Sequence, residues 1–276
     1  MATPRRPMTA PARLTGIRAV TLDFGNTLVP VDRPALRAVV ERTAQRCSAE
    51  LGLGDPALFL AAWAEERDRQ FREEVPEFRE VDLPQRSVRV LARLRGMPPP
   101  SHEARWDDRA AARRVTPHET ARVVETYSET FVASVPAPPV SGRVIRDLAT
   151  RGFKVAILSN WPLAATIDRF VEEAGWREHL VGVFVSQRIG TIKPHPAIFA
   201  HATSALGVQP RGILHVGDDW AADVVGAVRA GWRAAYLRNR QGDTPLPTST
   251  RSEDVHPDLE LDHLEELGAH LEDPSP

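Results

Sequence analysis

The sequence predicts an α/β protein whose parallel sheet, with helices on both faces, is interrupted after its first strand by an all-α insert. Three observations predict this fold. A short apolar run at residues 17–22 has the length of a buried strand and stops at Asp23. A long stretch with helical spacing follows it, and beyond residue 136 short apolar runs alternate with helices of about ten residues, which is typical of parallel sheets.

The all-α insert is expected over residues 33–135, because apolar side chains there recur at helical spacing, as at Leu36 and Val39. Breaks rich in proline and glycine separate one expected helix from the next. The α/β core is assigned to the two flanking ranges, 14–32 and 136–275. One domain is thus expected to interrupt the other.

The second part of the core is expected to alternate helices with strands. In chain order we expect helix and strand pairs at 144–150 and 155–158, 164–174 and 181–185, 197–206 and 213–216, and 221–230 and 234–237. Residues 259–271 are expected to add a last strand and helix. Residues 1–13 are rich in Pro, Thr and Ala, and we expect them to form a disordered tail.

Composition narrows the class of protein. The chain has 276 residues and a formal net charge of −2, so no overall positive field is available to attract nucleic acid or an anionic membrane. No apolar run approaches the ~18 residues that a membrane-spanning helix needs. Cys47 is the single cysteine, which excludes an internal disulfide. These features predict a cytoplasmic protein that binds neither nucleic acid nor membrane.

Polar residues follow the expected strands at the points where the strands end. The carboxyl ends of parallel strands meet at one edge of the sheet, where such folds bind their ligands. We therefore expect these side chains to lie close together. The candidates are Asp23 and Thr27 after the first strand, Ser159 and Asn160 after the second, Lys193 in a later loop, and Asp218, Asp219 and Asp223 after the fourth.

The chemistry of this set points to phosphate and a divalent cation. Asp23, Asp218, and either Asp219 or Asp223 would place several carboxylates in one cleft, where like charges force proton uptake unless a cation is present. Mg²⁺ is the usual cation beside phosphates. Lys193 and the cation would neutralise a phosphoryl group while Ser159 hydrogen-bonds its oxygens. The Asp23 carboxylate is then free to attack phosphorus.

These motifs, in this order, resemble the haloacid dehalogenase-like (HAD) hydrolase superfamily, and the position of the insert resembles its subfamily I with a helical cap. The resemblance implies a Rossmann-like core, Mg²⁺ as cofactor and a small phosphorylated molecule as substrate. It implies that Asp23 is the nucleophile, that Thr27, Ser159, Asn160 and Lys193 bind the substrate, that Asp23, Asp218 and the Gly25 carbonyl bind the metal, and that Asp219 and Asp223 support the site.

The sequence departs from that family at Gly25. Phosphatases of the superfamily carry a second Asp two residues after the nucleophile, and this Asp protonates the leaving oxygen and then activates water. Proton transfer of this kind contributes about 10²–10⁴-fold to a rate. We therefore expect a phosphatase that is slow, prefers good leaving groups, or takes an acid from the helical cap or from the substrate. We expect Gly25→Asp to raise turnover on alkyl phosphates if the missing acid limits the rate.

Two other hypotheses use the same residues. A 2-haloacid dehalogenase-type hydrolase needs no acid at Gly25, because halide leaves without a proton. Gly217-Asp218-Asp219 argues against it, since the metal-free dehalogenases resemble Ser-Ser-Asn there. A phosphonate-cleaving enzyme would be another reaction on the same nucleophile, but it needs a Schiff-base lysine in the insert, and the insert contains no lysine. The second hypothesis is a non-catalytic descendant that binds phosphate for regulation.

Overall fold

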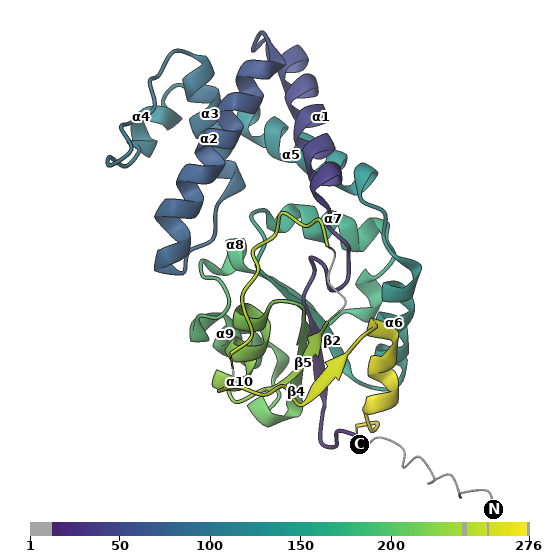
Figure 1. Ribbon diagram of the computed structural model, residues 1–276. Helices are drawn as coiled ribbons and strands as arrows, with labels where there is room; N and C mark the ends of the chain where they lie inside the picture. Colours follow the sequence, from purple (N-terminus) through teal and green to yellow (C-terminus); the bar gives the residue numbers. More distant parts are fainter. Residues whose placement is uncertain (1–12, 239–241, 253, 275–276) are drawn as a thin grey trace, which may run out of the picture.

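A six-stranded, fully parallel sheet forms the centre of the computed structural model, which describes residues 13–238, 242–252 and 254–274 (Figure 1). The strand order is β3-β2-β1-β4-β5-β6. In chain order the strands are β1 (Ala19–Leu22), β2 (Lys154–Ser159), β3 (Gly182–Val185), β4 (Ile213–Gly217), β5 (Arg233–Leu237) and β6 (Leu259–Leu261). Since β1 lies between β2 and β4, the segment that follows β1 leaves the sheet from its middle.

Both faces of the sheet are buried. Along β2, Val155 and Ile157 belong to one apolar cluster, and Ala156 and Leu158 belong to another on the opposite face. This period-2 division is expected for a parallel sheet covered on both sides. The covering elements are α6 (Pro139–Thr150), α7 (Ala164–Glu173), η2 (Arg177–His179), α8 (Ser186–Ile189), α9 (Pro196–Leu206), η3 (Pro210–Gly212), η4 (Trp220–Val225), α10 (Gly226–Arg229) and η5 (Leu264–His270).

The insert between β1 and α6 is helical and stands above the carboxyl ends of the strands (Figure 1). Side chains at N-cap positions start its helices, and Thr116 and Glu119 form a reciprocal capping box. Asp32, Asp55 and Asp82 accept the first free backbone N–H groups of three other helices. The insert comprises α1 (Arg33–Leu51), α2 (Pro56–Glu74), η1 (Val75–Glu77), α3 (Leu83–Leu94), α4 (Asp108–Ala112) and α5 (Pro117–Ser134).

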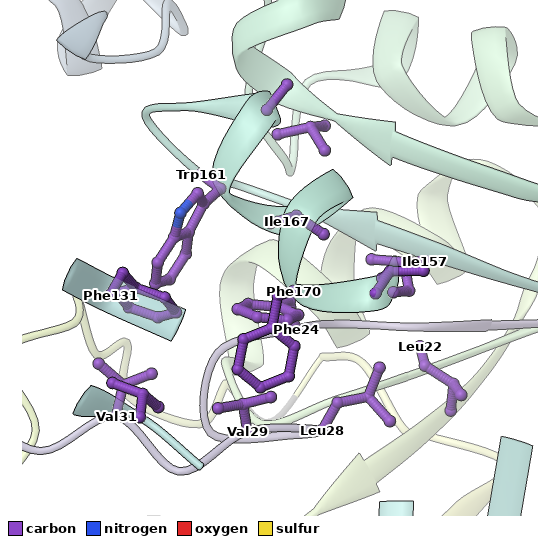
Figure 2. Close-up of a cluster of buried hydrophobic side chains, with 14 of the residues drawn as sticks. Leu22, Phe24, Leu28, Val29, Val31, Phe131, Ile157, Trp161, Ile167 and Phe170 are labelled. Carbon is purple, nitrogen blue, oxygen red and sulfur yellow. The ribbon is translucent and has the colours of Figure 1, made fainter. Parts of the chain in front are cut away.

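An aromatic cluster joins the insert to the core (Figure 2). Phe24 follows β1, and its ring lies 5.3 Å from that of Trp161 and 5.2 Å from that of Phe170. Phe131 of α5 lies 5.4 Å from Trp161. All four side chains are buried, and edge-on ring pairs of this kind add stability beyond the area that they bury. The loop after β1 is therefore held between the two parts of the chain.

The predicted fold class is confirmed: the core is a Rossmann-like parallel α/β sheet, and a helical insert follows its first strand. The last expected strand and helix are present as β6 and η5, although η5 is a 3-10 helix. The tail expected at residues 1–13 falls almost wholly outside the described residues. Within the described ranges, no helix is long and apolar enough to cross a membrane.

Candidate active site

The nucleophile candidate lies at the carboxyl end of β1. The Asp23 backbone N–H donates to the carbonyl of Val216 on β4 at 2.9 Å, and Asp23 is 8% exposed. Asn26 adopts a left-handed backbone with φ of 60°, and its Oδ1 accepts the Val31 N–H at 3.1 Å. Asparagine tolerates this conformation better than most residues. The turn therefore folds back immediately after Asp23, and the Asp23 carboxylate stays at the edge of the sheet.

Lys193 connects two of the predicted acids. Its Nζ donates to Asp23 Oδ1 at 2.8 Å, to Asp223 Oδ1 at 2.6 Å and to the Leu158 carbonyl at 2.8 Å. Lys193 is 2% exposed. Burial alone would lower the pKa of this ammonium group, but Asp223 and Asp23 outweigh burial and hold the pKa of Lys193 above its ordinary value. Lys193 is therefore a fixed positive charge beside the nucleophile candidate.

Asn160 positions the lysine loop. Its Oδ1 accepts the Lys193 backbone N–H at 2.7 Å, and its Nδ2 donates to the Lys193 carbonyl at 3.0 Å. Both ends of the Asn160 amide thus bind the backbone of the loop. The sequence placed Asn160 among the substrate-binding residues, whereas in this structure its hydrogen bonds orient Lys193.

Three carboxylates form the acidic part of the site. Asp23, Asp218 and Asp223 each offer an oxygen, and these oxygens all lie within 4.8 Å of one another. Thr27 Oγ1 donates to Asp218 Oδ1 at 3.3 Å, which ties the loop after β1 to the loop after β4. Burial raises the pKa of Asp23 despite the attraction of Lys193, and the nearby Asp223 raises it further. A cation at this cluster would oppose that proton uptake.

Both carboxylate oxygens of Asp223 already accept hydrogen bonds from other residues of the protein. Its Oδ1 accepts from Lys193 and lies 3.1 Å from Nε2 of His215, and its Oδ2 accepts the Asp219 backbone N–H at 2.9 Å. Burial opposes its charge, yet Lys193 and His215 together hold the pKa of Asp223 below its ordinary value. A Cβ added at Gly217 would lie 2.2 Å from the Asp223 carboxyl group. Only glycine at 217 leaves room for Asp223 to reach Lys193.

Asp219 serves the local backbone and lies outside the carboxylate cluster. Its Oδ1 accepts the Ala222 N–H at 2.8 Å, at the start of the π-helical η4. The same carboxylate accepts the backbone N–H and the hydroxyl of Ser249, each at 2.9 Å. The sequence left open whether Asp219 or Asp223 is the third acid of the cluster, and in the structure it is Asp223.

Ser159 provides a hydroxyl that faces no protein partner. It ends β2 and is 1% exposed, and within the described part of the chain its Oγ makes no hydrogen bond. A buried hydroxyl without a partner costs free energy, which a ligand oxygen can recover. Its position one strand away from Asp23 fits a donor to an anionic oxygen.

His215 is a site residue that the sequence analysis missed. It lies on β4 directly opposite Thr21 of β1, and its Nδ1 is 2.8 Å from Thr21 Oγ1. Its Nε2 faces Asp223 Oδ1 and lies 3.4 Å from Lys193 Nζ. Burial and the positive Lys193 lower the pKa of His215. A histidine within an apolar strand just before Gly-Asp-Asp was the available signal.

The space beside Gly25, where phosphatases of the resembled family carry an acid, is filled by Leu246 from the C-terminal part of the chain. A Cβ added at Gly25 would lie 2.6 Å from Leu246 Cδ1 and 3.4 Å from the Trp161 ring. Leu246 belongs to residues 242–252, which we call the strap, the yellow-green segment that runs from the foot of α1 toward α10 (Figure 1).

The strap is fixed at both ends. At one end, Asn26 Nδ2 donates to Thr244 Oγ1 at 3.0 Å, and Arg33 Nη2 donates to the Thr244 carbonyl at 3.2 Å. At the other end, Ser249 binds Asp219, as described above, and its Oγ accepts the Ala221 N–H at 2.6 Å. The strap therefore links the loop after β1 to the loop after β4.

Three buried arginines of the insert have structural partners. Arg69 donates to the carbonyls of Pro100, Ser101 and Ala104, which closes the loop that precedes α4. Arg89 forms a two-pronged ion pair with Asp108, with distances of 2.8 and 3.0 Å. Arg86 donates to Gln70 Oε1 at 3.0 Å, and its guanidinium group lies over the Trp63 ring. These side chains stabilise the insert itself.

The fold and site together define the family. A family model described as haloacid dehalogenase-like hydrolase matches residues 17–231, and the chain therefore belongs to that hydrolase family. The glyceraldehyde 3-phosphate phosphatase of Methanopyrus kandleri is 29% identical over 91% of this chain and 95% of its own length. The phosphoserine phosphatase of Thermus thermophilus is 31% identical over 48% of this chain, a match that spans half of that protein.

Solved structures show the same fold. The 2-haloacid dehalogenase of Pseudomonas syringae aligns with a TM-score of 0.61 at 22% identity, over 91% of this chain and 96% of its own. The HAD phosphatase of Thermococcus onnurineus aligns with a TM-score of 0.57 at 19% identity, over 94% of this chain and 99% of its own. Because both a dehalogenase and a phosphatase share the fold, the fold leaves the reaction to be argued from the site.

Proposed function

We propose that this hydrolase is a Mg²⁺-dependent phosphatase of small phosphate monoesters, and that its reaction passes through an aspartyl phosphate at Asp23. One observation carries the proposal: Asp23 lies 2.8 Å from Lys193 and within a cluster of three buried carboxylates, and the adjacent strand ends at Ser159, whose hydroxyl has no partner among the described residues. The excess negative charge of the three carboxylates favours binding of a hard cation such as Mg²⁺. Lys193 and the Ser159 hydroxyl can bind the oxygens of the phosphate group that such a cation accompanies.

The donor set fits Mg²⁺. The residues that would hold it are Asp23 and Asp218, together with the backbone carbonyl of Gly25. Asp223 is better suited to support Lys193, because both of its oxygens already accept hydrogen bonds. The cation, when bound, supplies positive charge against the phosphoryl oxygens.

The chain's own groups perform the remaining steps. Lys193 and Ser159 orient the phosphoryl group so that phosphorus faces an Asp23 oxygen. That oxygen forms a bond to phosphorus while the bond to the leaving oxygen breaks. Water then attacks phosphorus, the aspartyl phosphate is cleaved, and the Asp23 carboxylate is regenerated with release of inorganic phosphate. We propose that the helical insert, residues 33–135, covers the site and limits the access of bulk water.

A panel of phosphate monoesters tests this function. We expect phosphate release that requires Mg²⁺, stops with a chelator, and is absent from the Asp23→Asn protein used as blank. Equal release in chelator would contradict the role of the metal. Release by the Asp23→Asn protein would contradict the role of the nucleophile.

A 2-haloacid dehalogenase-type reaction is the second candidate. It is favoured by the absence of an acid at Gly25, since halide departs without a proton. The three clustered carboxylates argue against it, because halide displacement needs no cation. Release of halide from 2-chloropropionate without metal would favour this candidate over the phosphatase.

A further inference from the structure

The atoms nearest to the side-chain position of Gly25 are carbon atoms. The three nearest atoms to a Cβ on Gly25 would be Leu246 Cδ1, a ring carbon of Trp161 and Leu246 Cγ, at 2.6, 3.4 and 4.0 Å. Trp161 is 3% exposed, and Leu246 is half-buried. This surface is built by two segments far apart in the chain, the loop after β2 and the strap.

Four titratable groups of the site form one cluster. Lys193 Nζ contacts Asp23 and Asp223, and His215 Nε2 contacts Asp223, near the ends of β1 and β4. Phosphatases of this superfamily protonate the leaving oxygen from the position that Gly25 holds here, so we expect the leaving oxygen to lie beside Gly25. Among the described residues, the side chains nearest to that position are Leu246 and Trp161, and neither carries an acid able to protonate it.

The indole of Trp161 adds a donor that is not an acid. Within the described residues its Nε1 is buried and makes no hydrogen bond, so it is free to donate to a ligand. An indole N–H can hydrogen-bond an oxygen but does not transfer its proton at ordinary pH. Together the ring and the Leu246 side chain suit a flat or apolar leaving group.

We propose that Leu246 and Trp161 form a leaving-group pocket, and that the substrates are phosphates whose leaving group departs as a stabilised anion, namely aryl or acyl phosphates. This inference rests on the proposed phosphatase function. As Asp23 bonds to phosphorus, the leaving oxygen takes the bonding electron pair and departs as a phenolate or carboxylate without receiving a proton. Water later cleaves the aspartyl phosphate and loses its proton to solvent.

The strap explains why one substitution is insufficient to supply the acid. A carboxylate introduced by Gly25→Asp would have to displace the end of the Leu246 side chain. The gain on alkyl phosphates that the sequence predicts for Gly25→Asp is therefore expected mainly in the double variant Gly25→Asp/Leu246→Ala. Leu246→Ala alone is the matched control, because it opens the space without adding an acid.

The test compares kcat/KM along a series of substituted phenyl phosphates and simple alkyl phosphates with Mg²⁺ present. We expect a steep fall as the leaving group becomes more basic, with alkyl phosphates about 10²–10⁴-fold slower than nitrophenyl phosphate. The double variant should flatten that dependence, whereas Leu246→Ala should not.

Two results would contradict different claims. Alkyl phosphates hydrolysed as fast as aryl phosphates by the wild-type protein would overturn the leaving-group pocket and leave the phosphatase function standing. No phosphate from any ester or acyl phosphate, or release unchanged by Asp23→Asn, would overturn the function itself. The wild-type series decides the first point even if the double variant does not fold.

Discussion

Buried charged side chains occur in both parts of the molecule, but they are paired differently in the insert and in the core. In the insert, Glu66 is fully buried and accepts from Trp106 Nε1 at 2.7 Å and Arg93 Nη1 at 2.9 Å. Arg89 and Arg93 each pair with a carboxylate there, and Arg69 donates to three backbone carbonyls. In the core, Lys193 faces a cluster of three carboxylates, and the nearby Ser159 hydroxyl has no protein partner among the described residues.

This difference separates a structural ion network from a binding site. A network whose charges balance internally stabilises one fold and has no capacity left for a ligand. A cluster with excess negative charge and a spare donor is costly unless something binds.

Removal of the nucleophile should have the largest effect. Asp23→Asn keeps the shape and a hydrogen-bond acceptor for Lys193 but removes the attacking charge. We expect kcat for phosphate release to fall by about 10³–10⁶-fold, as is usual when a nucleophile is lost. Steady-state assays with an aryl phosphate measure this, and an unchanged circular dichroism spectrum confirms folding. Retention of a tenth of the activity would contradict the assignment.

Disruption of the insert network should affect stability instead. Glu66→Ala leaves the Trp106 indole without its acceptor and leaves Arg93 only its exposed partner Glu65. We expect the free energy of unfolding to fall by about 3–5 kcal/mol, because a buried ion pair is broken from one side. Urea denaturation gives this value. Below the unfolding transition, kcat and KM should be close to wild type, and a large change in kcat would show that the network takes part in catalysis.

Divalent metal should stabilise the core cluster. At a Mg²⁺ concentration of a hundred times its Kd, we expect about 2.7 kcal/mol of added stability, which thermal unfolding detects as a higher Tm. Asp218→Asn should lose this shift, and Glu66→Ala should retain it. If Asp218→Asn responds to Mg²⁺ as wild type does, the metal is not held by the carboxylate cluster.

The smallest effect concerns Glu80, which lies at the contact between insert and core and hydrogen-bonds Ser186. Burial raises the pKa of Glu80 to about 7, against the lowering effect of that hydrogen bond. The folded protein thus holds a proton that the unfolded chain releases near pH 4.5, so stability should fall as pH rises from about 4.5 to 7. We expect a change of about 1–2 kcal/mol, which is less than the full shift implies because Glu80 is only half-buried.

Glu80→Gln isolates this effect, since glutamine keeps a hydrogen-bond acceptor and does not titrate. Urea denaturation across this pH range should give a flatter profile for the variant than for wild type. Identical profiles would show that Glu80 titrates normally in the folded protein.

The sequence predicted the sheet and most of the site because both depend on local patterns. Apolar runs that stop at Asp23, Ser159 and Asp218 mark strand ends, and parallel strands bring such ends together. The membership of Asp223 in the carboxylate cluster followed from the structure. It depended on the π-helical turn η4, which carries the Asp223 side chain back to Gly217.

The missed features depend on contacts between distant residues. Leu246 reaches Gly25 from the far end of the chain, and Ser249 binds Asp219 thirty residues away. The strap has neither helical nor strand periodicity, so no local pattern indicated where it lies. His215 was missed for the opposite reason, since its place within an apolar strand made it resemble a core residue.

The most direct test of the central claim is detection of phosphoryl-Asp23. An aryl phosphate is mixed with excess protein and Mg²⁺, quenched in acid within a single turnover, digested, and analysed by peptide mass spectrometry. The account predicts that the peptide containing Asp23 gains one phosphoryl group, which then disappears as inorganic phosphate is released. Phosphate release with no phosphorylated peptide at any time point, or with the group on another residue, would contradict it.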